Sequence, residues 1–99
     1  MISTVTLLGL MGDPVPGNPE FRYVDFESRD AFDEAPYFSK IPVAYWDRSV
    51  SNYLLRIPKG HYAVIFGRVE TDPEVGLYVL VEQIRHFQSN LKVHQIKED

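Results

Sequence analysis

The chain has 99 residues, about the size of one domain, and its 44% of hydrophobic residues exclude an intrinsically disordered protein. The absence of cysteine excludes a disulfide framework and a thiolate metal site. The formal net charge of −4 has the wrong sign for a typical nucleic-acid binder, but it is uneven: residues 1–39 carry two basic and seven acidic groups (2 − 7 = −5), whereas residues 40–99 carry eight and seven (8 − 7 = +1).

The first third of the chain predicts two strands separated by a loop. Residues 2–10 are aliphatic and β-branched, as strands prefer, and the glycines and prolines of residues 9–17 predict a loop after them. Residues 21–27 predict the second strand, and residues 28–36 predict a polar loop. Because strand side chains alternate, the second strand has two faces: Val24 and Phe26 on one, and Phe21, Tyr23 and Asp25 on the other.

A third strand and a short helix are predicted next. Residues 38–46 predict a strand that turns Trp46 outward, and Pro42, which has no backbone donor, indicates an edge or a bulge. Asp47 is the expected N-cap of a helix near residues 47–57. The side chains expected in the core are Ile41, Val43 and Tyr45 from the strand and Val50, Leu54 and Ile57 from the helix.

Two more strands complete the predicted order. Residues 62–70 and 77–87 predict the fourth and fifth strands, joined by a tight connection at residues 72–76, and residues 88–99 predict a tail or a short extra strand. Three strands, one short helix and two strands are the element order of the OB-fold, a five-stranded Greek-key barrel. We therefore expect one all-β OB-fold domain over residues 1–99.

No motif for catalysis or for a cofactor is visible. The histidines His61, His86 and His94 have no carboxylate or cysteine at ligand spacing, so no metal site is predicted. The segment Gly9-Leu10-Met11-Gly12 lacks the spacing and the helical context of a phosphate-binding loop, and no nucleophile motif is present. We expect a protein that is not an enzyme and that needs no cofactor.

The sequence does not predict a membrane or secreted protein. Residues 1–4 lack the basic start and apolar run of a signal peptide, and no apolar run approaches the roughly 20 residues of a membrane span. Together with the absence of cysteine, this predicts a cytoplasmic location.

Five segments in order carry a resemblance to a known family. The first has an aliphatic strand, then Gly9, two residues, Gly12 and the pair Asp13-Pro14. The match runs over residues 2–87, with the segments in the order of that family. The set resembles the single-stranded-DNA-binding proteins of bacteria and phages: Val5–Pro14, Val24–Ser28, Tyr53–Gly60, Phe66–Thr71 and Gly76–Phe87.

The resemblance implies a binding face of aromatic and basic side chains. Aromatic rings of that family stack on unpaired bases without reading sequence, at about 1–3 kcal/mol per base, and basic side chains track phosphates. Trp46 falls where the family often has a stacking aromatic, and Lys40 where some members have tryptophan. In another open interpretation, Phe21 and Tyr23 pack in a dimer interface. The implied DNA-binding residues are Trp46, Tyr23, Lys40, Arg56 and Arg68.

Two functions remain open from the sequence. The first is non-catalytic binding of single-stranded DNA by a homodimer or homotetramer, which protects exposed strands during replication, recombination, or transfer of a mobile element or phage. The second is an OB-fold interaction module whose partners are replication or primosome proteins, with weak or no nucleic-acid binding. The outward Trp46 and Tyr23 favour the first function. The acidic charge, and Leu10 where the family usually has a basic or amide residue, favour the second.

Overall fold

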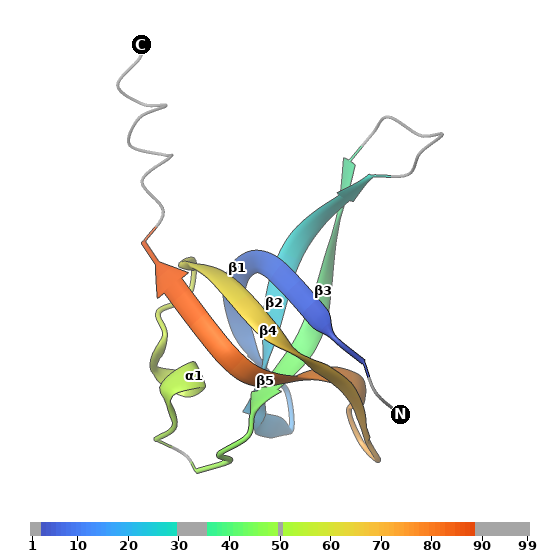
Figure 1. The fold of residues 1–99 in the computed structure, drawn as a ribbon, viewed down its shortest axis with the longest axis vertical. Helices are drawn as coiled ribbons and strands as arrows, with labels where there is room; N and C mark the ends of the chain where they lie inside the picture. Colours follow the sequence, from blue (N-terminus) through green and yellow to red (C-terminus); the bar gives the residue numbers. More distant parts are fainter. Residues whose placement is uncertain (1–2, 30–35, 50, 89–99) are drawn as a thin grey trace.

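The protein forms a closed five-stranded β-barrel with one short helix (Figure 1). This computed structural model describes residues 3–29, 36–49 and 51–88. The strand order around the barrel is β1-β2-β3-β5-β4, and every neighbouring pair is antiparallel except β3 and β5. The predicted all-β barrel with a helix between the third and fourth strands is confirmed. The elements are β1 (Val5–Val15), β2 (Asn18–Arg29), β3 (Pro36–Tyr45), α1 (Tyr53–Arg56), β4 (Tyr62–Asp72) and β5 (Gly76–Phe87).

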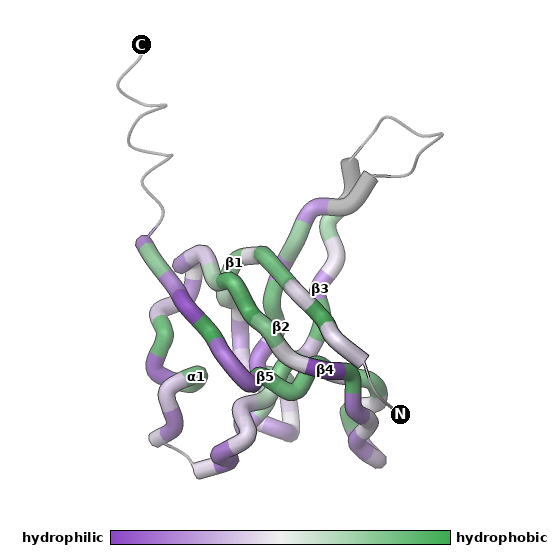
Figure 2. The backbone as a smooth tube through the Cα atoms, in the orientation of Figure 1, coloured by the Kyte–Doolittle hydropathy of each residue, from purple (hydrophilic) through white to green (hydrophobic). Residues whose placement is uncertain are grey.

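The interior of the barrel is apolar, and α1 lies at one end of it (Figure 1). Side chains of a strand point alternately into and out of the barrel. Figure 2 shows hydrophobic and hydrophilic stretches along β5. Leu54 and Ile57 are buried, which confirms the inward stripe of the helix, while Val50 lies outside the described residues. The buried residues of this core are Met11, Val24, Val43, Leu54, Ile57, Ala63, Ile65, Val79 and Val81.

A second, smaller core covers part of the outside of the barrel. Val43 and Val79 are paired in register and point inward, so their neighbours Ala44 and Tyr78 point outward, yet both are buried. Val15, the last residue of β1, and Val75, in the turn between β4 and β5, cover these side chains. Part of the outer face of β2, β3 and β5 is therefore closed to solvent.

The first strand is longer than predicted, since β1 continues to Val15 and the expected loop at residues 9–17 is mostly strand. Register shifts on either side of Pro14 form an irregularity that accommodates the proline without ending the pairing with β2. Gly9 does not mark a loop. A Cβ at this position would lie 2.5 Å from the backbone oxygen of Asp25, so the glycine allows β2 to approach closely.

The helix is shorter than predicted and has another N-cap. It covers Tyr53–Arg56, and the side chain of Asn52 accepts a hydrogen bond from the Leu55 amide at 3.1 Å. The expected cap, Asp47, instead accepts a bond from the Ser49 amide at 3.0 Å and closes a local turn. No helix in the described ranges is long and apolar enough to cross a membrane.

Two predictions about strand faces have different outcomes. Trp46 is exposed, as predicted, although it lies just after β3 rather than within it. Phe21 does not share an open face with Tyr23, because the second core buries it completely and its ring meets that of Tyr78 edge-on at 4.9 Å.

Pro42 pairs with β2 on one side, whereas the pairing of β3 with β5 on the other side begins only at Val43. Of the two predicted positions for Pro42, an edge or a bulge, the edge is confirmed. The tight 72–76 connection is also confirmed, whereas the predicted tail or strand lies outside the described residues beyond residue 88.

Candidate nucleic-acid interface

The outer side of β2 and β3 carries an open face next to the second core. Leu10 pairs in register with Asp25, and Asp25 pairs with Lys40, so these three side chains form one row across β1, β2 and β3. Tyr23 is in the neighbouring row on one side and Phe38 in the neighbouring row on the other. We call this surface the β2–β3 face: Leu10, Tyr23, Asp25, Phe38 and Lys40.

A ring and a cation lie together on this face. The Lys40 Nζ atom is 4.4 Å from the centre of the Tyr23 ring, within the range of a cation–π contact. Phe38, two residues before Lys40, is 79% exposed, the most exposed large hydrophobic residue among those described. Two rings beside an ammonium group suit a planar ligand that carries negative charge.

The same face also carries negative charge. A pocket of about 190 Å³ beside Tyr23 is lined by Lys40 together with the carboxylates of Asp13 and Asp25. Asp13 is ion-paired at 3.0 Å with Lys59, an exposed contact that screening makes weak. The local field therefore gives a polyanion only modest attraction.

The structure separates the remaining predicted site residues from Tyr23 and Lys40. Trp46 is 64% exposed, with its ring centre 5.5 Å from that of Tyr45. It follows Lys40 by six residues along an extended segment, which places the two roughly 20 Å apart. Arg56 is exposed in the last turn of α1, on the helix side of the barrel.

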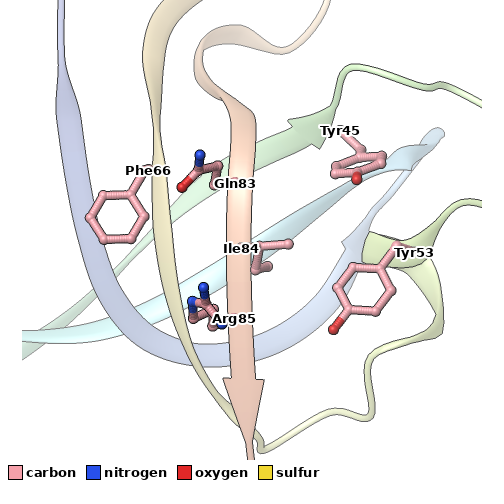
Figure 3. Close-up of a pocket in the computed structure, with 6 residues that line it drawn as sticks. All are labelled: Tyr45, Tyr53, Phe66, Gln83, Ile84 and Arg85. Atoms are coloured by element: carbon pink, nitrogen blue, oxygen red, sulfur yellow. The ribbon is translucent and has the colours of Figure 1, made fainter.

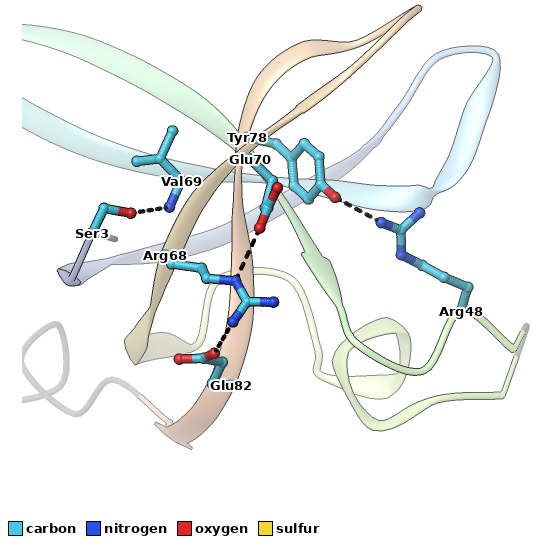
Figure 4. Close-up of polar contacts among 7 residues, drawn as sticks. All are labelled: Ser3, Arg48, Arg68, Val69, Glu70, Tyr78 and Glu82. Atoms are coloured by element: carbon cyan, nitrogen blue, oxygen red, sulfur yellow. Dashed lines mark hydrogen bonds and ion pairs between the residues drawn. The ribbon is translucent and has the colours of Figure 1, made fainter. Parts of the chain in front are cut away.

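Arg68 is held by two carboxylates (Figure 4). Its Nε donates to Glu70 at 2.9 Å and its Nη1 donates to Glu82 at 3.0 Å. One positive charge between two negative charges leaves this part of β4 and β5 acidic. The position of Arg68 on the barrel surface therefore gives no excess of positive charge.

Sequence reasoning missed two residues next to these surfaces. Phe38 has the parity of Lys40, so strand alternation was a usable signal for its exposure. Arg48 had no signal: its guanidinium lies 5.0 Å from the Phe21 ring centre, and its Nη2 donates to the Tyr78 hydroxyl at 2.9 Å (Figure 4). These partners are on β2 and β5, and only the closed barrel brings them to Arg48.

Two of the three histidines come together in space. β4 and β5 pair so that the Nδ1 atoms of His61 and His86 are 3.1 Å apart, with the rings stacked. No group of three or more potential metal ligands is present within the ranges that the structure describes. His94 lies outside these ranges.

A closed barrel of five strands in this order, with its helix between β3 and β4, is an OB-fold. Solved structures share this fold with the chain. The protein priB from Ralstonia solanacearum matches with a TM-score of 0.56 and 14% identity over 88% of this chain and 100% of that chain. The mitochondrial single-stranded DNA binding protein Rim1 from S. cerevisiae matches with a TM-score of 0.51 and 15% identity over 90% and 97%. No family model and no curated protein matches the sequence.

Proposed function

We propose that this chain is a non-catalytic, single-domain OB-fold protein that binds single-stranded DNA. The observation that carries the proposal is the Lys40 ammonium over the Tyr23 ring beside the exposed Phe38, on the strand 2–3 face that OB-folds use for oligonucleotides. The proposal also assigns DNA contacts to Trp46 and Arg56, which are exposed but lie away from this face. The fold shared with Rim1, which is named for single-stranded DNA binding, supports the proposal. The role is protection of exposed strands in the cytoplasm during replication, recombination, or transfer of a mobile element or phage.

A second candidate function is a protein-interaction module of a replication assembly. The observation that favours it is the exposed apolar surface of Leu8 and Leu10 on β1, next to the carboxylates of Asp25 and Glu27. Oligo-dT separates the two candidates. A protein that shows no retention of oligo-dT at low salt, and no change in tryptophan fluorescence, is the interaction module.

Replacing Trp46 with alanine is expected to weaken oligo-dT binding by about 1–3 kcal/mol, the usual cost of losing one base–aromatic stack. Trp46 is the single tryptophan and is 64% exposed, so its own fluorescence reports the contact in the wild type. Anisotropy of a labelled oligo-dT measures the variants. Trp46→Phe keeps a ring and is the matched control, and equal binding by the alanine and phenylalanine variants would exclude stacking at this position.

Replacing Lys40 with alanine is expected to lower affinity for all sequences alike and to flatten the salt dependence by roughly 0.7 in the log–log slope. The reason is the loss of one phosphate contact, which carries no sequence information. Binding isotherms across a series of salt concentrations give the slope. Arg68→Gln is the comparison: because Glu70 and Glu82 already hold that guanidinium, we expect a smaller change in slope. A wild-type slope in the Lys40 variant would remove Lys40 from the interface.

Sedimentation at micromolar concentration is expected to show a homodimer or homotetramer rather than the 11.4 kDa monomer. Leu8 is 60% exposed on β1, so this strand presents an apolar side chain that association would bury. The substitution Leu8→Glu should shift the wild type toward monomer. A wild type that is monomeric throughout this range would contradict the assembly.

A further inference from the structure

A pocket opens beside β5 on the helix side of the barrel (Figure 3). β5 pairs with β3 only from Val79 to Val81, so beyond that point its edge faces α1 instead of a strand. The pocket has a volume of about 360 Å³. Figure 3 shows Tyr45, Tyr53 and Ile84 on one side of β5 and Phe66 on the other. The lining residues are Tyr45, Tyr53, Phe66, Gln83, Ile84 and Arg85.

Rings continue from this pocket in both directions. The Tyr45 ring centre is 5.5 Å from that of Trp46, and the Tyr53 ring centre is 5.5 Å from that of His86. His86 in turn stacks on His61, with 5.3 Å between the ring centres. These residues run from the end of β3, past α1, to the start of β4. We call them the aromatic track: Trp46, Tyr45, Tyr53, His86 and His61.

The charges at the pocket suit an anionic ligand. Among the residues that the structure describes, no carboxylate lines this pocket, whereas Asp13 and Asp25 line the one beside Tyr23. Arg85 supplies an exposed guanidinium at the pocket, and Arg56 is the last residue of α1. The chain as a whole has a net charge of −4. This pocket differs from the β2–β3 face because its described lining residues include rings and an arginine but no aspartate or glutamate.

We propose that the aromatic track is a second binding surface for single-stranded nucleic acid, with one unpaired base on Tyr53 and a phosphate on Arg85. The inference rests on the proposed function and names a surface on the helix side in addition to the β2–β3 face. The rings form two groups, Trp46 with Tyr45 and Tyr53 with His86 and His61, and the pocket lies between them. The open face of Tyr53 is available for stacking, because every base has a π-face. A guanidinium holds phosphate oxygens in two-pronged geometry. Gln83 adds an amide that can bond to a base edge.

Photocrosslinking locates the strand directly on the full chain. Oligo-dT that carries 5-iododeoxyuridine is bound at low salt and irradiated, and the crosslinked tryptic peptides are identified by mass spectrometry. Trypsin separates the surfaces: Tyr53 lies in peptide 49–56 and His61 in peptide 60–68, whereas Tyr23 lies in peptide 23–29 and Phe38 in peptide 30–40. Crosslinks in peptides 49–56 and 60–68 support the track.

Affinity of matched variants completes the test. Tyr53→Leu should lower oligo-dT affinity by about 5- to 150-fold, the range for one lost stack, and Tyr53→Phe should restore it. Arg85→Gln should flatten the salt slope by roughly 0.7. Retention of oligo-dT with crosslinks confined to peptides 23–29 and 30–40 would overturn the track and leave the proposed function intact. No retention of oligo-dT by the wild type would refute both.

Discussion

Replacing Arg22 with methionine is expected to lower the free energy of unfolding by about 3–5 kcal/mol, since it removes a buried charged donor that serves three carbonyl oxygens. Arg22 lies in β2 and is only 5% exposed. Its Nε and Nη2 donate to the Gly12 oxygen at 3.2 and 2.7 Å, and its Nη1 donates to the oxygens of Leu54, at 3.0 Å, and Ile57. One side chain thus ties the bent part of β1 to the end of α1.

Burial lowers the pKa of the Arg22 guanidinium from its ordinary value, and the carboxylate of Asp13 acts in the opposite direction. An arginine in this setting stays charged near neutral pH, so the methionine variant loses ion–dipole contacts as well as hydrogen bonds. Thermal unfolding followed by circular dichroism measures the change, at about 4–8 °C for each kcal/mol in a domain of this size.

Two variants bracket the effect of Arg22. Arg22→Lys keeps the charge but lacks the planar fork that reaches carbonyls on both sides, so its stability should fall between those of wild type and Arg22→Met. Arg68→Met removes an exposed arginine held by two glutamates, and it should cost less than about 1 kcal/mol. If Arg22→Met cost no more than Arg68→Met, the tie between β1 and α1 would carry no stability.

Replacing Gly67 with alanine is expected to cost about 3 kcal/mol or more, at the upper end of overpacking effects. A Cβ at this position would lie 2.0 Å from the Leu80 backbone oxygen and 2.9 Å from its carbonyl carbon, so β4 and β5 would have to separate. The site coincides with the register shift between Phe66 and Gly67, where β4 bends around the barrel. Urea unfolding of the variant measures the loss.

Gly17 provides the control, because a Cβ there has no atom within 4 Å, although its φ of +82° favours glycine. Gly17→Asn should therefore cost only about 1 kcal/mol, since asparagine tolerates the left-handed region better than other side chains. Equal costs at Gly17 and Gly67 would show that backbone conformation, rather than the close approach of β5, explains the glycine at position 67.

Much of the fold was predictable from local pattern. Alternation in the third strand correctly placed Val43 inside and Trp46 outside, and the apolar spacing of Leu54 and Ile57 correctly oriented the helix. The boundaries were less predictable. Glycines and prolines after residue 9 were interpreted as a loop, yet they lie in a strand because β2 approaches closely and an irregular register accommodates Pro14.

The candidate site was only partly predictable. Tyr23 and Lys40 do meet, since β2 and β3 are neighbours in both sequence and space. Their distance from Trp46, and the carboxylates that hold Arg68, were not accessible from motif order. The assignment of all five predicted residues to DNA stays a prediction, and the binding experiments above decide it.

By itself the sequence determined the order of elements, the all-β barrel and the inward stripes, because strand and helix periodicities are properties of a few neighbouring residues. Only the tertiary structure decided which outward rings stay open. Phe21 is covered by Tyr78, whereas Phe38 is 79% exposed. The aromatic track likewise depends on His61 and His86, which are 25 residues apart and meet only through the pairing of β4 with β5. Alternation fixes the side of a strand on which a residue lies, but its exposure depends on which distant segments pack over that side.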